Sequence, residues 1–181
     1  MNELLIDSHV ENLAATERLS GEIYRQYLSD HRNCLLLLEG ELGAGKTAFV
    51  HALGPALGLR ANINSPTFNL LNVYENPRRA PDACDLYHYD LYRVNDPREF
   101  EQLDFVERWT ETPRASEPAR LHAIEWWQRA GDALPRTVAR YRLVLELIEP
   151  DMNSDGVAIA DAGADSDVDF EERRRIQLYR L

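Results

Sequence analysis

The segment from residue 40 to residue 47 combines residue types and spacing that could bind phosphate. Its sequence, Gly40-Glu-Leu-Gly-Ala-Gly-Lys-Thr47, matches the pattern G-x-x-x-x-G-K-[ST] at every fixed position. Glycines allow the turns that point successive N–H groups at a β-phosphate, and the following helix adds its dipole. Lys46 would contact the β- and γ-phosphates, and the Thr47 hydroxyl would coordinate Mg²⁺. We therefore predict a nucleoside triphosphate site formed by Glu41, Leu42, Gly43, Ala44, Gly45, Lys46, Thr47 and Ala48.

Two acidic residues further along the chain could complete the magnesium site. Such an ion needs oxygen ligands beyond a threonine hydroxyl, normally an acid at the end of a neighbouring strand. Asp90 lies within the run His-Tyr-Asp-Leu-Tyr-Arg, and Glu125 follows a short apolar run. Taken singly, either acid could equally be solvated or cap a helix. With the phosphate-binding loop, we predict Asp90 as the closer metal ligand and Glu125 as the group that orients water. The predicted metal set is Thr47, Asp90 and Glu125, and the predicted catalytic set is Lys46, Asp90 and Glu125.

A proline-containing segment after the loop's helix could respond to the nucleotide. In the run Asn-Ser65-Pro-Thr67-Phe, the proline fixes the backbone and biases Ser65 toward an extended conformation. Many nucleotide-binding proteins of this kind place a γ-phosphate-sensing hydroxyl here, so Ser65 or Thr67 is a candidate switch residue. A plain Ser-Pro turn is the alternative that the spacing alone leaves open.

The hydrophobic pattern around these residues predicts the elements that position them. Helices are predicted over residues 11–30, 46–57 and 97–109, the second interrupted at Gly54-Pro55 and capped by Gly58. Strands are predicted over residues 34–38, 67–74, 85–94, 121–126 and 138–148, the second and third as an antiparallel pair. The predicted fold is α/β: a P-loop NTPase-like three-layer sandwich, with a mixed, mainly parallel sheet and helices on both faces.

Motif absence, net charge and hydropathy limit which cofactor, cellular compartment and partners we expect. The Asn-Lys-x-Asp pattern that reads guanine is absent from the sequence, which favours ATP. The net charge of −11 argues against direct binding to a nucleic-acid backbone. We expect a soluble, cytoplasmic protein without membrane contact, because the sequence contains neither a signal peptide nor a long apolar stretch. The two cysteines, Cys34 and Cys84, are expected to have no redox or metal role.

The length of 181 residues predicts one folded domain, followed by an acidic extension. We assign residues 1–149 to a P-loop ATPase domain and residues 150–181 to a C-terminal tail. Residues 149–172 contain many acids and no Lys or Arg. This composition predicts that residues 150–170 are mobile, because little apolar surface offsets the entropy lost on ordering.

The order of the motifs resembles that of a known family, the bacterial TsaE (YjeE-like) ATPases required for threonylcarbamoyladenosine modification of tRNA. The resemblance extends over residues 34–127. It rests on the phosphate-binding loop, then Ser65-Pro-Thr-Phe68, His88-x-Asp90-Leu-Tyr-Arg93, Glu99 followed by Leu103, and Ile124-Glu125-Trp126. The loop alone is generic, whereas the other motifs in this order are specific.

The resemblance implies both a reaction and partners. Lys46 and Thr47 would hold Mg·ATP, Asp90 would act as the Walker B-like acid, and Glu125 would assist the metal or the attacking water. Family members work with a TsaD–TsaB pair that modifies adenosine 37 of tRNA. By this resemblance, ATP hydrolysis would reset that complex. Contact of this chain with tRNA would then be indirect. Trp126 would lie near the nucleotide. Arg93 receives no assigned role.

Three features depart from the family pattern. Leu103-Asp104 replaces the usual Leu-Gly, which predicts a local difference in that turn, and Trp127 replaces the proline that commonly follows Glu-Trp. The acidic tail has no counterpart. None of the three alters the phosphate-binding loop.

Two other functions use the same loop. A small-molecule kinase would pass the phosphoryl group to a bound hydroxyl, but no arginine-rich lid is recognisable. A nucleotide-dependent binding module would use ATP only to order the segment near Ser65, and turnover with the partners present would distinguish it.

Overall fold

Strand β2 (Asn33–Glu39) lies at the centre of the fold and carries the phosphate-binding loop at its end. The structure is a computed structural model that describes residues 2–96, 99–148 and 173–181. The sequence of β2 is almost continuously apolar, which is typical of a strand buried on both faces. Its side chains are accordingly buried in two separate hydrophobic clusters, one on each face of the sheet.

The described strands form one seven-stranded sheet in the order β1-β7-β6-β2-β5-β4-β3. The strands β2, β6, β5 and β4 pair in parallel, and antiparallel pairing adds β3 at one edge and β7 and β1 at the other. Five of the seven strands therefore run in one direction, and β3 and β7 run in the other. The other strand bounds are β1 (Glu3–Val10), β3 (Leu71–Tyr74), β4 (Cys84–Asp90), β5 (Ala119–Glu125), β6 (Ala139–Leu147) and β7 (Arg174–Arg180).

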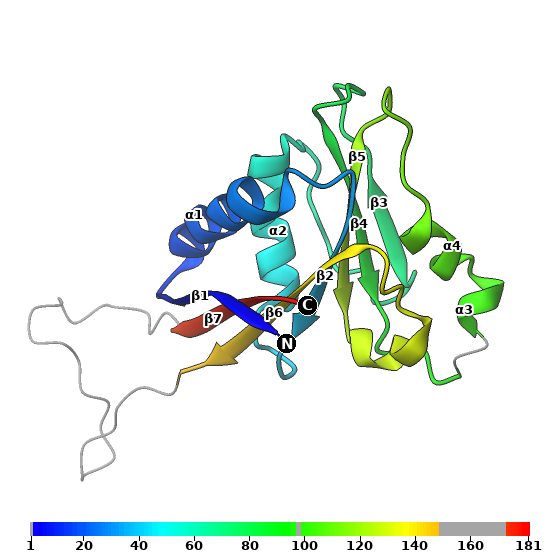
Figure 1. Ribbon diagram of the computed structural model, residues 1–181. Helices are drawn as coiled ribbons and strands as arrows, with labels where there is room; N and C mark the ends of the chain where they lie inside the picture. The colour runs from blue at the N-terminus through cyan, green and yellow to red at the C-terminus, as the bar shows by residue number, and fades with distance from the viewer. Residues whose placement is uncertain (1, 97–98, 149–172) are drawn as a thin grey trace, which may run out of the picture.

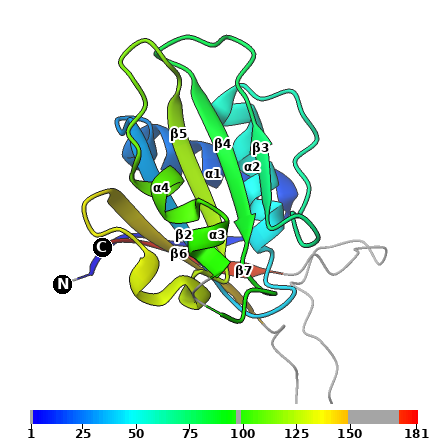
Figure 2. The ribbon, with the colours of Figure 1, turned by 90° about the vertical axis from the view of Figure 1, so that its right-hand side faces the viewer.

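Helices cover both faces of this sheet, as Figures 1 and 2 show. One face packs against α1 (Leu13–Ile23), its π-helical continuation η1 (Tyr24–Leu28), and α2 (Lys46–Leu57). The other face packs against α3 (Glu99–Gln102), α4 (Phe105–Thr110) and the 3₁₀ segment η2 (Trp127–Ala133). The predicted three-layer α/β fold with a mixed, mainly parallel sheet is thus confirmed.

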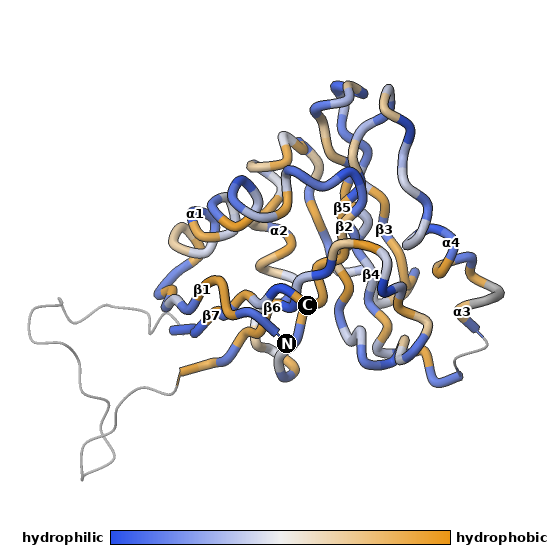
Figure 3. Tube along the Cα trace, in the orientation of Figure 1, coloured by the Kyte–Doolittle hydropathy of each residue, from blue (hydrophilic) through white to orange (hydrophobic). Residues whose placement is uncertain are grey.

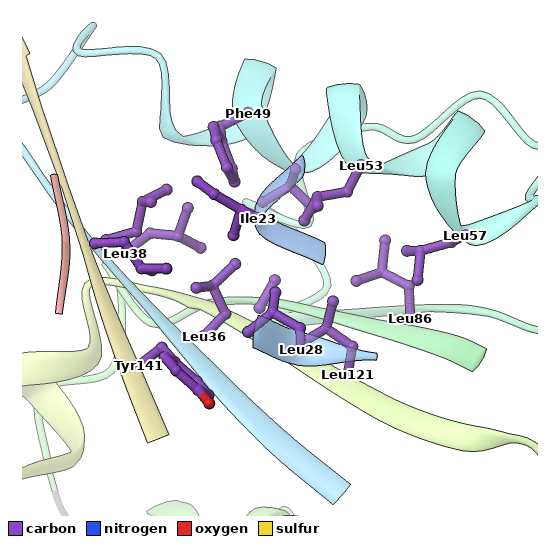
Figure 4. Packing of buried hydrophobic residues seen from close by; sticks show 14 of the residues in the cluster. Ile23, Leu28, Leu36, Leu38, Phe49, Leu53, Leu57, Leu86, Leu121 and Tyr141 are labelled. Atoms are coloured by element: carbon purple, nitrogen blue, oxygen red, sulfur yellow. The ribbon is translucent and has the colours of Figure 1, made fainter. Parts of the chain in front are cut away.

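The two cores follow the period-two alternation of the central strands. Leu36 and Leu38 of β2 face α1 and α2, where Figure 4 shows them opposite Phe49 and Leu53. Leu35 of β2 faces the other way and packs with the helices of the opposite layer. Hydrophobic residues accordingly gather along α2 and the central strands (Figure 3). No helix in the described part of the chain is long and apolar enough to cross a membrane.

Several predicted element bounds differ from the structure because single residues adopt unexpected backbone conformations. The third predicted helix is two short ones, separated where Asp104 adopts a left-handed φ of 54°. The strand predicted over residues 67–74 begins only at Leu71, because the N–H groups of Asn69 and Leu70 turn back to the carbonyl of Pro66. Conversely, α2 continues unbroken through Pro55 and ends, as predicted, at Gly58 in the left-handed conformation.

The prediction that residues 150–181 form a tail is wrong for the last strand. Arg174–Arg180 forms β7, which inserts between β1 and β6 and buries Ile176 and Leu178 in the larger core. In β7, buried Ile176 and Leu178 alternate with partly buried Arg175, Gln177 and Tyr179, the pattern of a sheet with one face packed on the core. The mobility predicted for residues 150–170 concerns residues outside the described part of the chain.

Candidate functional site

The phosphate-binding loop joins the end of β2 to the start of α2. Gly45 precedes the helix with a φ of 97°, a conformation that side chains other than glycine rarely adopt. Gly40 at the other end passes so close to β6 that an added Cβ would lie 2.6 Å from the carbonyl oxygen of Leu145. Both glycines are therefore required by the path of the loop, and N–H groups at the start of α2 are available for an anion.

Lys46 lies inside the loop, where its ammonium group has three contacts. Its Nζ donates hydrogen bonds of 2.8 Å to the carbonyl oxygens of Gly40 and Glu41, and it lies 4.5 Å from the centre of the Trp126 ring. Burial lowers the pKa of Lys46, and the negative charges of Glu125 and Asp90 partly oppose this shift. The ammonium group is thus held by two loop carbonyls, and the charges of Asp90 and Glu125 act on it through space.

Asp90 and Glu125 end neighbouring parallel strands, β4 and β5, and are register partners. Both side chains are largely buried. The Thr47 hydroxyl donates a 2.7 Å hydrogen bond to Glu125 Oε1, which joins the first turn of α2 to the end of β5. The three predicted metal-binding residues therefore lie close together at the carboxyl ends of the parallel strands.

The switch candidates are linked to the same acids. The Thr67 hydroxyl donates a 2.8 Å hydrogen bond to Asp90 Oδ2, and it also contacts the hydroxyl of Ser65. The other oxygen of Asp90 accepts a hydrogen bond from the backbone N–H of Tyr92. Next to Thr67, Phe68 is 84% exposed, and the Arg93 guanidinium lies 4.8 Å from the centre of its ring. Arg93, which had no predicted role, thus stacks on the switch segment.

His88 belongs to this site, although its position in the sequence predicts no role for it. It is fully buried, and its Nε2 lies 2.8 Å from the same Glu125 oxygen that accepts the Thr47 bond. Its Nδ1 has no hydrogen-bond partner among the described residues. Alternation along β4 could have revealed it, because residues two apart in a strand share a face and His88 precedes Asp90 by two.

A cavity of about 1110 Å³ opens beside the loop. Lys46 and Trp126 belong to its lining, whereas Thr47, Asp90 and Glu125 do not. Its walls come from the end of β2, the loop, the segment after β5 and the end of β6; Gln128, Arg129, Val144 and Glu146 are among them. Trp126 adopts a left-handed φ of 57°, which turns the chain away from β5 and places its ring against Tyr92 as well as Lys46.

The site has the chemistry expected for a nucleotide bound with magnesium. Its hydroxyl and two carboxylates are hard oxygen donors of the kind that Mg²⁺ prefers, and the loop supplies backbone N–H groups for phosphates. Sites made of three or more His, Cys, Asp or Glu side chains do not occur in residues 2–96, 99–148 and 173–181. Metal binding here would instead combine Asp90 and Glu125 with Thr47.

Comparison with known proteins places most of the chain in one family. The family model described as "Threonylcarbamoyl adenosine biosynthesis protein TsaE" matches residues 10–153. The curated TsaE protein of Synechocystis is 35% identical over 129 residues, which cover 71% of this chain and 74% of that protein. The TsaE protein of Aquifex aeolicus is 40% identical over 129 residues, covering 70% and 80%.

A solved structure agrees at the level of the fold. The crystal structure of Bacillus subtilis YdiB superimposes with a TM-score of 0.63 at 19% identity, covering all of this chain and 88% of that one. The match includes the region of β7, which lies beyond the family match.

Proposed function

This chain belongs to the TsaE family of tRNA threonylcarbamoyladenosine biosynthesis proteins, and from that premise we propose that it is a magnesium-dependent ATPase of this pathway. The single observation that carries the proposal is the 2.7 Å bond between Thr47 and Glu125, which lies directly behind the phosphate-binding loop. Asp90 is the register partner of Glu125 on the neighbouring strand. This combination matches the needs of a triphosphate and its metal ion.

Binding would begin with the loop and Lys46. The N–H groups at the start of α2 would donate hydrogen bonds to the phosphates. Lys46 would exchange its hydrogen bonds to the Gly40 and Glu41 carbonyls for bonds to phosphate oxygens. The nearby carboxylates favour the charged form of Lys46, which the interaction with phosphate requires. Mg²⁺ would supply positive charge to the phosphates, with Thr47, Asp90 and Glu125 as the residues that hold it.

Hydrolysis would depend on the acids and on their buried neighbours. Glu125 would accept a hydrogen bond from water and orient it for in-line attack on the γ-phosphate. His88, which lies 2.8 Å from Glu125, would keep that carboxylate in position. Thr67 would report the presence of the γ-phosphate, because its hydroxyl now bonds to Asp90 and would be drawn away by a nearby phosphate oxygen.

The partner is proposed to be a TsaD–TsaB-type complex. ATP binding would order the segment around Thr67, and the exposed Phe68 would transmit that change to the complex. Contact with tRNA would be indirect, because the chain carries a net charge of −11. The protein would drive and reset the modification of adenosine 37 without carrying out the transfer.

ATP hydrolysis by the purified chain, alone and with the cognate TsaD–TsaB pair, tests the proposal. We expect the partners to stimulate hydrolysis and Mg·ATP to promote association in a pull-down. Lys46→Ala should abolish nucleotide binding, and Asp90→Ala should retain some binding and lose turnover. Asp132→Ala, an exposed aspartate in η2, is the control and should behave as wild type.

Each contrary outcome has a distinct meaning. Wild-type turnover in Asp90→Ala would contradict the metal-site assignment. Transfer of phosphate to an added hydroxyl compound, rather than to water, would support the small-molecule kinase instead. Nucleotide-dependent association without turnover would indicate a binding module.

A further inference from the structure

The first residue of β7 contacts the phosphate-binding loop from its outer side. Arg174 Nε donates a 3.2 Å hydrogen bond to the carbonyl oxygen of Ala44, a residue 130 positions earlier in the chain. A Cβ added to Gly45 would lie 2.9 Å from the same nitrogen and 3.3 Å from Arg174 Cδ. The Arg174 side chain therefore lies directly against the peptide that joins Ala44 to Gly45.

The sheet topology explains why the last strand reaches the loop. β7 runs antiparallel to β6, so its first residue lies opposite the last residue of β6, and Leu147 is the register partner of Arg174. The end of β6 already touches the loop where Leu145 meets Gly40. The loop thus contacts β6 at its start and Arg174 near its end.

The Ala44–Gly45 peptide is one of those whose orientation matters for phosphate binding, because its N–H belongs to the phosphate-binding loop. A peptide group is planar and trans, so its C=O and N–H point in opposite directions. A donor that holds the Ala44 carbonyl outward also directs the Gly45 N–H to the inner side of the loop. A cationic donor further polarises the peptide and makes that N–H a better hydrogen-bond donor.

We propose that Arg174 is a positioning residue that orients the Ala44–Gly45 peptide for phosphate binding. The proposal rests on the proposed nucleotide-binding function and extends it to a strand outside the family match, which ends at residue 153. Arg174 acts through the peptide and does not itself contact the nucleotide. Its loss should weaken binding of any ligand whose β-phosphate occupies the loop.

The test compares Mg·ADP affinity in Arg174→Met and Arg173→Met by calorimetric titration. Methionine preserves an unbranched side chain and removes the donor. Arg173, the adjacent exposed arginine, is 3.9 Å from Glu11 and has no hydrogen bond to the loop, which makes it the matched control. We expect affinity to fall about tenfold in Arg174→Met, the effect of one charge-assisted hydrogen bond, and to stay within about twofold in Arg173→Met.

A spectroscopic measurement separates positioning from stability. The chain has nine glycines, so ¹⁵N-glycine labelling yields a small set of amide signals that includes Gly45. In wild type we expect Mg·ADP to shift the Gly45 amide proton strongly, and in Arg174→Met we expect that shift to shrink. If Arg174→Met does not fold, Arg174→Leu, which also lacks a donor, replaces it in both measurements.

Two results would overturn the proposal. Equal Mg·ADP affinity and an equal Gly45 shift in Arg174→Met and wild type, with only the melting temperature lowered, would show a merely structural role. A wild-type chain that binds neither Mg·ADP nor Mg·ATP would overturn the proposed function as well.

Discussion

His122 is expected to make the stability of this protein depend on pH. The residue lies in β5, fully buried, with its Nδ1 3.1 Å from the Tyr89 hydroxyl and its ring stacked near Tyr87. Burial, together with the positive charges of Arg120 and Arg108, lowers the pKa of His122 to about 3. The imidazole is therefore neutral in the folded protein throughout the physiological range.

The size of the effect follows from the difference between the folded and unfolded pKa values. In the unfolded chain a histidine titrates near 6.5, so between pH 6.5 and 3 the unfolded state binds more protons and stability falls as the pH is lowered. At pH 5 the unfolded histidine is almost fully protonated and folded His122 is not. The free energy of unfolding at pH 5 should thus be about 2 kcal/mol lower than at pH 8 through His122 alone.

Urea denaturation at pH 8 and pH 5 measures this contribution as a difference between variants. In His122→Asn, which offers Tyr89 a replacement hydrogen-bond partner, the fall in stability between the two pH values should be about 2 kcal/mol smaller than in wild type. His9→Asn, which replaces an exposed histidine of β1, serves as the control. An equal fall in wild type and His122→Asn would refute the reasoning, whatever the stability of the variant at pH 8.

Three further predictions concern the site and the core. Lys46 is the single lysine of the chain, so ¹³C-methylation yields one lysine signal. The pKa of Lys46 should lie below 10.5 because of burial, and Glu125→Gln should lower it further by removing a favourable negative charge. Leu53→Ala should lower the free energy of unfolding by about 3 kcal/mol in urea titrations, because Leu53 is fully buried, whereas exposed Leu42→Ala should change it by less than about 0.5 kcal/mol. Thr67→Val should slow partner-stimulated ATP turnover about tenfold and leave Mg·ADP affinity within about twofold, because it removes one hydroxyl that bonds to the β4 carboxylate. The first prediction would be contradicted by a Lys46 pKa that is unchanged in Glu125→Gln. The second would be contradicted by equal losses of unfolding free energy in the two leucine variants, and the third by wild-type ATP turnover in Thr67→Val.

The central layer of the fold could be predicted from the sequence because its signals are local. The apolar run of β2 and the helical periodicity of α2 flank a motif whose glycines leave few backbone alternatives. Asp90 and Glu125 could be chosen because each ends a strand-like run beside that motif. Their pairing in register confirms that these two strand ends are adjacent.

The pairing of the outer strands β1 and β7 could not be predicted in the same way. β1 and β7 pair only through contacts between residues more than 160 positions apart, and no local pattern indicates that pairing. The acidic composition before β7 also favours the prediction of a tail that extends over the short strand β7. Likewise, the contact of Arg174 with the loop depends on where β7 starts, which periodicity alone does not determine.

The insertion of β7 between β1 and β6 has a consequence for the order in which the chain can fold. Of the strands, β1 is synthesised first, yet within the described sheet its only strand partner is β7. Glu3 pairs with Arg180, and Figure 1 shows the two ends of the chain close together. Closing so long a loop is slow compared with forming local contacts. A nascent chain can therefore assemble β2, α2 and the neighbouring parallel strands while β1 still lacks its partner. We expect the phosphate-binding loop to exist before the strand that supports it, and the nucleotide site to reach its final form only when β7 joins the sheet.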